Sequence, residues 1–218
     1  MALRAALFDM DRTLLAADTA WLFTRHRFRR REIGMVDVGR VAYWTLQYRL
    51  GVIDAPRVAA RVLADYAGHD ERELTEHVET WFRADALHYL RARARETVER
   101  HRAEGDILAI ATSATPYGTR PLARELGIDH IVASELEVDP SGRLTGRVVE
   151  PLCYGTGKLA RVRCLAEKLG FRLEDSVFYS DSINDLPLLE RVGTPVVVTP
   201  DRKLRRIAER RGWRVERW

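Results

Sequence analysis

Two carboxylates near the start of the chain have the spacing of a catalytic or metal-binding pair. Asp9 and Asp11 follow directly after residues 3–8, a short and mostly apolar run that predicts a buried strand. Aspartate disfavours strands, so Asp9 marks the point where the strand opens into a loop. The carboxyl ends of strands are where open α/β sheets bind ligands. Two carboxylates there need a metal ion or a proton to neutralise them, although both could instead cap a turn.

Other polar groups occupy equivalent places later in the chain. A hydroxyl follows the apolar run 107–111, and two carboxylates follow the apolar run 177–179. An ammonium group lies at the start of the helix that precedes run 177–179. With the first pair, the set is Asp9, Asp11, Ser113, Lys158, Asp181 and Asp185. The carboxyl ends of parallel strands share one edge of a sheet, so we expect these distant residues to meet there.

Such a set of side chains suits phosphoryl chemistry. Asp9 and Asp181, with a backbone carbonyl and water, form a hard oxygen site of the kind that binds Mg²⁺. The Ser113 hydroxyl, the Lys158 ammonium and loop N–H groups would hold the oxygens of a phosphoryl group. A carboxylate beside them can attack phosphorus and form an aspartyl-phosphate. Asp11 could then protonate the leaving oxygen and later take a proton from water.

Hydrophobic periodicity predicts the elements that position these groups. Residues 18–90 show almost no strand signal, and we expect helices at 18–31, 36–50, 54–66, 70–82 and 86–102. Farther along, the patterns predict strands at 106–112, 131–133, 176–179 and 195–198, a hairpin at 136–149, and helices at 117–126, 157–169, 183–192 and 204–211.

Strands that alternate with helices predict an α/β fold, a Rossmann-like parallel sheet with helices on both faces. The purely helical stretch interrupts this alternation directly after the first strand, and a structureless loop of that length is implausible. We therefore expect an all-helical cap above the carboxyl end of that strand. Residues 1–15 and 87–218 are assigned to the catalytic core and residues 16–86 to the cap.

Composition restricts the class of protein. A chain of 218 residues fits one domain with an insertion, and its net charge of +4 is mildly basic, which suits anionic substrates. Cys153 and Cys164 have no metal-type spacing, which indicates reduced thiols in a cytoplasmic protein. Charged residues interrupt the early apolar run, so no signal peptide is expected. No apolar run reaches the roughly 18 residues of a membrane-spanning helix.

In order and across the whole core, these motifs resemble those of the haloacid dehalogenase (HAD) superfamily of aspartate-nucleophile phosphatases. Residues 9–13 (DMDRT) resemble the first signature, Ser113 the second motif, Lys158 the third and residues 180–185 the fourth. The helical insert and the sequence around the fourth motif resemble subclass IB, the phosphoserine-phosphatase-like hydrolases. The dehalogenases lack the second aspartate, so Asp11 indicates phosphate chemistry.

The resemblance implies a role for each site residue. Asp9 would be the nucleophile and a Mg²⁺ ligand. Asp11 would be the general acid and base, with its backbone carbonyl on Mg²⁺, and Asp181 would be the third protein ligand. Ser113 and Lys158 would bind the phosphate.

The resemblance also implies supporting residues. Thr13 would stabilise the first-motif turn, Asp185 would orient Lys158 and a metal-bound water, and Asn184 would support the fourth motif. Asp18 is a candidate substrate contact, because it stands where phosphoserine-specific members carry a longer Glu that meets the substrate's ammonium group. In this family the cap sets substrate specificity.

Together these features predict a Mg²⁺-dependent phosphomonoester hydrolase that acts through an aspartyl-phosphate intermediate on a small or amphiphilic phosphate ester. The alternatives are a phosphotransferase of the same fold and a non-catalytic module that binds anions or nucleic acid. We expect a small-molecule phosphate ester as the partner, no nucleic acid and no transmembrane segment; peripheral membrane contact and oligomeric state stay open. The arginine string at 25–31 is expected to be a solvated helix face, the alternative being an attraction for anionic substrates or lipid headgroups.

Overall fold

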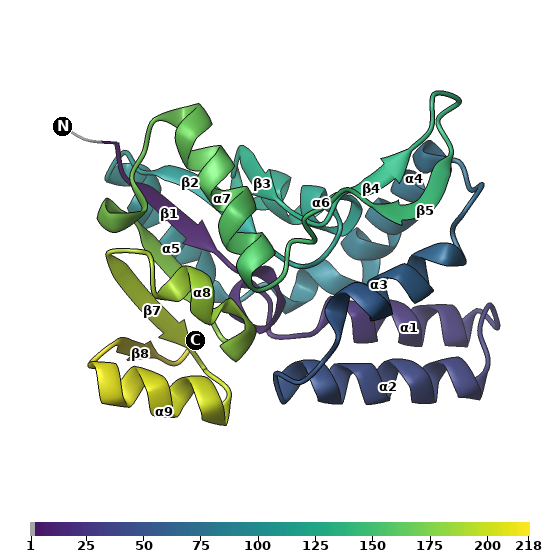
Figure 1. Cartoon of the computed structure of the whole chain (residues 1–218), viewed down its shortest axis with the longest axis horizontal. Coiled ribbons are helices and arrows are strands. Elements are labelled where there is room, and N and C mark those ends of the chain that lie inside the picture. Colours follow the sequence, from purple (N-terminus) through teal and green to yellow (C-terminus); the bar gives the residue numbers. More distant parts are fainter. Residues whose placement is uncertain (1–2) are drawn as a thin grey trace.

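The computed structural model describes residues 3–218, in which a six-stranded sheet has the order β3-β2-β1-β6-β7-β8 (Figure 1). Every neighbouring pair in it is parallel. Its strands are β1 (Ala5–Phe8), β2 (Ile107–Ala111), β3 (His130–Val132), β6 (Val177–Ser180), β7 (Thr194–Val198) and β8 (Arg214–Glu216). The predicted Rossmann-like α/β fold is therefore confirmed, with β1 in the interior of the sheet.

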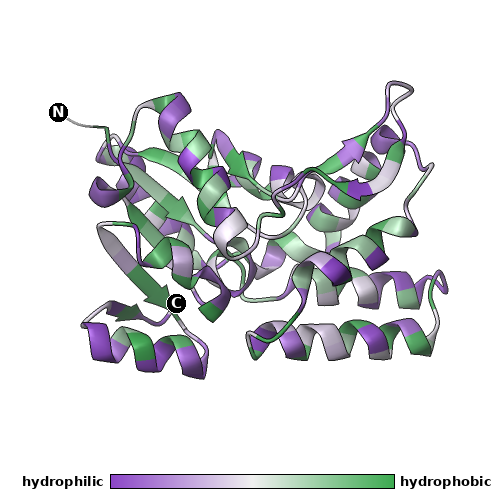
Figure 2. Cartoon of the chain, viewed as in Figure 1, coloured by the Kyte–Doolittle hydropathy of each residue, from purple (hydrophilic) through white to green (hydrophobic). Residues whose placement is uncertain are grey.

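Helices cover both faces of the sheet, and β1 shows why its sequence is a continuous apolar run. Ala6 and Phe8 point into one hydrophobic core, whereas Ala5 and Leu7 point into a second core on the opposite face. The first core includes residues of α5 (Ala92–Ala103) and α6 (Pro116–Leu126), and the second includes residues of α7 (Thr156–Leu169), α8 (Leu186–Leu189) and α9 (Arg202–Arg211). Figure 2 shows these strands as largely hydrophobic, between helices of mixed character.

Between β1 and α5 the chain forms the expected helical insert. Its helices are α1 (Thr19–Arg29), α2 (Met35–Arg49), α3 (Ala55–Ala64) and α4 (Glu71–Trp81). Asp18, Asp54 and Asp70 accept backbone N–H groups at the starts of α1, α3 and α4, as N-cap residues do. α1 and α2 run side by side in opposite directions (Figure 1), and none of the described helices is long and apolar enough to cross a bilayer.

Several elements differ from the prediction, among them the helix predicted at 183–192, which forms as a 3-10 turn over Ile183–Asp185 followed by the short α8. The helix predicted at 86–102 starts only at Ala92, because Leu90 is extended and forms an antiparallel bridge with Leu15 where the chain returns to the core. Strand β8 was not predicted. Its sequence Arg-Val-Glu is charged, as edge strands often are, and therefore lacks the apolar signal of a strand.

The predicted hairpin forms as β4 (Leu136–Val138) and β5 (Leu144–Val148), but it packs against the insert. The Gly68 N–H donates to the Leu144 carbonyl at 2.8 Å, and the Leu144 N–H donates to the His69 carbonyl at 2.9 Å. Gly146 has φ +80, and a Cβ there would lie 3.3 Å from the carbonyl oxygen of Leu63. The close approach of β5 to α3 thus depends on a glycine.

Candidate active site

The first site residue, Asp9, lies directly after β1 in the interior of the sheet. Its side chain is buried, and its N–H donates to the Tyr179 carbonyl at 2.9 Å. Because Phe8 is paired with Tyr179 in the β1–β6 ladder, Asp9 and Asp181 end neighbouring strands. Neighbouring strands lie about 4.8 Å apart, so the two carboxylates share one edge of the sheet as the sequence predicted.

The loop after Asp9 turns sharply and presents Asp11. Arg12 adopts φ +61, a left-handed conformation that non-glycine residues adopt only rarely, and its N–H donates to the Ala17 carbonyl at 3.1 Å. The Asp11 carboxylate accepts two hydrogen bonds from Thr19, from the N–H at 2.9 Å and from the hydroxyl at 3.0 Å. Thr19 is the first residue of α1, so the helical insert itself fixes the orientation of Asp11.

Lys158 lies between two carboxylates at the start of α7. Its side chain is 1% exposed, and its ammonium group lies 3.0 Å from Asp9 Oδ1 and 2.6 Å from Asp185 Oδ1. The other oxygen of Asp185 accepts the Ser180 hydroxyl at 2.7 Å. Asp185 therefore orients Lys158 towards Asp9, in the arrangement expected of a supporting residue.

Asp181 is paired with a cation from the first loop. Arg12 Nε donates to Asp181 Oδ2 at 3.0 Å, and the Asp181 carbonyl accepts the Asp201 N–H at 3.0 Å. Asp201 in turn accepts the Ile183 N–H at 2.8 Å. These bonds fix the β6 loop relative to the start of α9.

Burial changes the protonation of the site. It raises the pKa of Asp9 to about 6, although Lys158 acts in the opposite direction. Burial and the charges of Asp18 and Asp9 raise the pKa of Asp11 well above its ordinary value, and burial together with Asp9 does the same for Asp181. Burial alone would lower the pKa of Lys158, but Asp185 and Asp9 raise it well above its ordinary value. Lys158 is therefore charged at neutral pH, and Asp11 has a reason to carry a proton.

The donor set fits a divalent cation. Four carboxylates, those of Asp9, Asp11, Asp181 and Asp185, accompany only two cationic side chains within contact distance, those of Lys158 and Arg12. With Asp11 protonated, one negative charge lacks a counterion among the described residues, and with Asp11 ionised, two do. Mg²⁺ prefers oxygen ligands and commonly uses one or two carboxylates, so Asp9 and Asp181 could hold it with the Asp11 carbonyl.

A second acidic cluster lies elsewhere, just before β2, and consists of His101, Glu104 and Asp106. Asp106 is already paired with Arg4 Nε at 2.7 Å and with His101 Nδ1 at 2.6 Å. This cluster stands at the amino end of the strands, away from Asp9, and its pairing with Arg4 indicates a structural network.

The insert contacts the site through α2. Tyr48 places its hydroxyl 3.4 Å from the Ser113 hydroxyl, and its backbone carbonyl accepts the Asn184 side-chain amide at 2.9 Å. The Tyr154 hydroxyl donates to the carbonyl oxygen of the same Asn184 side chain at 2.8 Å. Asn184 thus joins the loop after β6 to the end of α2, whereas the buried Thr13 hydroxyl has no hydrogen-bond partner among the described residues.

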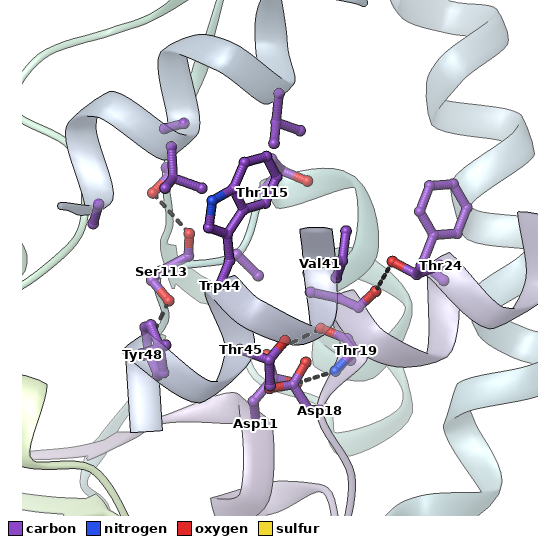
Figure 3. A pocket seen from close by; sticks show the side chains of 18 of the residues that line it. Asp11, Asp18, Thr19, Thr24, Val41, Trp44, Thr45, Tyr48, Ser113 and Thr115 are labelled. Carbon is purple, nitrogen blue, oxygen red and sulfur yellow. Dashed lines mark hydrogen bonds between the residues drawn. The ribbon is translucent and has the colours of Figure 1, made fainter. Parts of the chain in front are cut away.

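A cavity of about 1330 Å³ leads from the site into the insert. Asp11, Ser113 and Asp181 belong to its wall on the core side. Figure 3 shows Asp11 near Thr19 and Thr45, and Ser113 near Tyr48. Asp18 also lines the cavity, but one of its oxygens accepts the Trp21 N–H at 3.0 Å and so caps α1.

Comparison with known proteins identifies the family. The family model of the haloacid dehalogenase-like hydrolases matches residues 6–190, a range that includes every candidate site residue from Asp9 to Asp185. The chain belongs to this family. It is a HAD phosphatase, and several of its relatives are named phosphatases.

Three similar proteins illustrate the range of HAD relatives. A protein of Mycobacterium tuberculosis named phosphoserine phosphatase is 34% identical over 216 residues, covering 97% of this chain and 70% of the relative. A histidinol-phosphatase of Neisseria meningitidis serogroup C is 29% identical over 217 residues, covering 96% of each chain. A solved structure from Bordetella pertussis, described as having unknown function, is 34% identical with a TM-score of 0.87 and covers 99% of both chains.

A solved phosphoserine phosphatase, described as a phospho-aspartyl intermediate analogue, has a TM-score of 0.74 at 19% identity and covers 99% of this chain and 93% of its own. At that identity the likeness concerns the fold. It agrees with the architecture of the HAD phosphatase described above.

The structure brings most of the predicted site residues together. Asp9, Lys158 and Asp185 are in direct contact, and Asp11, Ser113 and Asp181 line one cavity. The partners of these residues were not predicted: Thr19, Ser180 and Tyr154 look like ordinary helix-start, strand and loop residues in the sequence. In the arginine string, residues 25 and 29–31 are exposed as predicted, but Arg27 is half-buried and lines the cavity.

Proposed function

We propose that this HAD phosphatase is a Mg²⁺-dependent phosphomonoester hydrolase that acts through a phosphorylated Asp9, on a small or amphiphilic phosphate ester. The observation that carries the proposal is the pair of unlike carboxylates on one loop. Asp9 contacts Lys158, which favours its charged form, whereas no cationic side chain of residues 3–218 contacts Asp11, whose pKa is raised well above its ordinary value. One carboxylate is suited to attack and the other to donate a proton.

The reaction would proceed in two displacements. A carboxylate oxygen of Asp9 attacks phosphorus, the bond between phosphorus and the ester oxygen breaks, and the proton of Asp11 passes to the leaving alkoxide. Water then attacks the phosphorus of the aspartyl-phosphate, its proton passes to Asp11, and phosphate leaves with regeneration of the Asp9 carboxylate. Mg²⁺, held by Asp9, Asp181 and the Asp11 carbonyl, would supply charge neutralisation at the phosphoryl oxygens.

Ser113 and Lys158 would hold the phosphoryl group during both displacements. Lys158 reaches Asp9 directly, and the Ser113 hydroxyl lies at the cavity wall on the neighbouring strand end. We infer that Asp185 keeps Lys158 in place. Thr13 stays a predicted support of the turn, since no hydrogen bond of its hydroxyl argues for more.

The names of the relatives favour a small-molecule phosphate ester but differ in substrate, phosphoserine for one and histidinol phosphate for another. These names therefore do not decide between substrates. We propose that residues 16–86 form a cap that sets substrate specificity, and that the β4–β5 hairpin is part of this cap. Asp18 remains a candidate contact with the substrate. A cytoplasmic location also stays a prediction.

The test compares wild type with Asp9→Asn on a panel of phosphate monoesters, with Mg²⁺ and with a chelator. We expect phosphate release only from wild type with Mg²⁺. Asp129→Asn, which changes an exposed aspartate on the core, serves as the matched control and should keep full activity. Equal activity of Asp9→Asn and wild type would remove the nucleophile assignment.

The same panel separates hydrolysis from phosphotransfer. A phosphotransferase of the same fold would transfer the group to an added alcohol, so the yield of inorganic phosphate would fall while a new ester appears. A pure anion-binding module would release no phosphate, and it would have no need of a protonated Asp11 beside Asp9.

A further inference from the structure

The cavity beside the site is much larger than a phosphate group requires. Its volume of about 1330 Å³ exceeds the roughly 300–1,000 Å³ that is usual for small-molecule pockets. Most of its wall comes from the helices of the insert, with the core contributing the end that carries Asp11, Ser113 and Asp181. The space therefore has to accept the part of the substrate that is not phosphate.

The long axis of the cavity runs along α1 and α2. At the catalytic end α1 contributes Thr19 and α2 contributes Thr45, which lie near Asp11 in Figure 3. Because the two helices are antiparallel, Arg27 near the end of α1 and Asp37 near the start of α2 line the opposite end. Thr19 and Arg27 lie eight positions apart in α1, so the cavity extends about 12 Å along this helix at a rise of ~1.5 Å per residue.

Apolar side chains from all four helices of the insert form the middle of this space. They are Phe23 of α1, Val41 and Trp44 of α2, Val58, Val62 and Leu63 of α3, and Leu74, Val78 and Trp81 of α4. Leu63, Val78 and Trp81 are already buried, whereas the other six residues are half-buried or exposed, so a polar ligand such as an amino-acid phosphate would leave the surface of these six in contact with water. Apolar surface gains free energy only when an apolar group covers it.

Two arginines at the far end already have acidic partners, whereas Arg61 and Asp65, which also line the cavity, have no ion pair among the described residues. Arg27 lies 3.4 Å from Glu32 and donates to the Tyr66 hydroxyl at 3.2 Å, and Arg40 lies 3.2 Å from Asp37. These pairs neutralise each other, so they create no demand for a second charged group on the ligand. The cavity thus combines one anion-binding end with an apolar body.

We propose that the cavity holds an extended apolar chain of about 12 Å, and that the substrates are amphiphilic phosphate monoesters with a single long chain. This inference rests on the proposed function, and it narrows the substrate from small or amphiphilic esters to the amphiphilic class. Each methylene moved from water into the cavity should improve kcat/KM by up to about fourfold, as expected for ~0.8 kcal/mol per methylene.

The experiment measures kcat/KM for a series of n-alkyl phosphates from ethyl to dodecyl, each below the concentration at which it forms micelles, with phosphoserine and an aryl phosphate for reference. We expect a steep rise with chain length until the cavity is filled, and a total gain of at least 100-fold over ethyl phosphate, a conservative estimate for several methylenes. A flat series with ready hydrolysis of the aryl phosphate would overturn the inference and leave the proposed function standing.

Two substitutions in α2 test where the alkyl chain of the substrate lies. Val41→Trp places a large side chain in the cavity wall and should lower kcat/KM for dodecyl phosphate at least tenfold more than it lowers kcat/KM for ethyl phosphate. Val36→Trp is the matched control, because Val36 is 74% exposed and does not line the cavity. Equal effects of the two substitutions on the whole series would place the chain elsewhere.

A binding measurement makes the inference independent of turnover. Octylphosphonate and methylphosphonate, whose carbon–phosphorus bonds are not hydrolysed, are titrated into wild-type protein and followed by tryptophan fluorescence, since Trp44 and Trp81 stand in the cavity wall. Octylphosphonate should bind at least 100-fold more tightly. Equal affinities would refute the apolar-chain site, whereas tight octylphosphonate binding without hydrolysis of any ester would support the site and refute the proposed activity.

Discussion

Replacement of Lys158 by methionine tests the electrostatic centre of the site. The side chain is enclosed, and its ammonium group separates two buried carboxylates, those of Asp9 and Asp185. Methionine has a similar length but no charge, so the substitution leaves two like charges facing each other without a cation. Removal of one partner from a buried ion pair costs about 3–5 kcal/mol of folding free energy. For a domain of this size that corresponds to a decrease in Tm of roughly 6–20 °C.

The assay is thermal and urea unfolding at pH 7.5 in the presence of a chelator, so that no metal substitutes for the lost cation. Lys168→Met is the matched control, an exposed lysine on the same helix, and should change stability by no more than about 0.5 kcal/mol. Removal of the Lys158 and Asp185 charges together should destabilise the fold less than the two separate removals would predict. We expect Lys158→Met combined with Asp185→Asn to be more stable than the sum of the single effects by at least about 1 kcal/mol. Additive single effects, or a Lys158→Met protein as stable as the control, would refute the buried ion-pair reasoning.

Three further predictions concern metal, pH and the cap. Asp11→Asn should slow turnover by about 10²–10⁴-fold yet keep the Mg²⁺-dependent rise in Tm, whereas Asp181→Asn should lose that rise. If calorimetry shows that both variants lose Mg²⁺ affinity to a similar extent, the assignment of Asp11 to proton transfer and of Asp181 to metal binding is wrong. Burial lowers the pKa of His101, so as the pH falls this histidine is protonated in the unfolded chain before it is protonated in the folded protein. The free energy of unfolding should therefore fall as the pH drops below about 6.5. In unfolding curves, the stability of His101→Gln should depend less on pH between that value and the lower pKa of the folded protein. Asn184→Ala removes the amide bonded to the Tyr48 carbonyl, and should lower kcat/KM about tenfold, mainly through KM, without changing the pH profile; a loss confined to kcat would place Asn184 in the chemistry instead.

The sequence was sufficient for the central residues because their placement follows from topology alone. Asp9 and Asp181 each follow an apolar strand, and neighbouring parallel strands necessarily bring their carboxyl ends together. Lys158 could be placed from the same reasoning, since it starts the helix that packs beside those strands. The order of the sheet, which sets β1 next to both β2 and β6, was not predicted, because the alternation of elements leaves the strand order open.

The residues that hold this set in place could not be found in the same way. Thr19 reads as the first residue of a helix, and nothing local shows that Asp11 will accept its N–H and hydroxyl. The contact between Asn184 and Tyr48 joins residues 136 positions apart on elements whose relative placement depends on packing of the whole insert. Arg27 looked like part of a solvated string for the same reason, since only the position of α3 brings Tyr66 next to it.

These contacts connect the proposed chemistry with the proposed cap. Asp11, the proposed proton donor, is part of the core loop, yet both of its described hydrogen bonds come from Thr19 at the start of the insert. Asn184, in the loop that carries Asp181, holds the end of α2. A substrate that displaces α1 or α2 would therefore also displace the carboxylate proposed to protonate the leaving group, and misplacement of about 1 Å can cost ~10²-fold in rate. An ester that fits the cavity keeps both helices in position, so selection among phosphate esters should act on kcat as well as on binding.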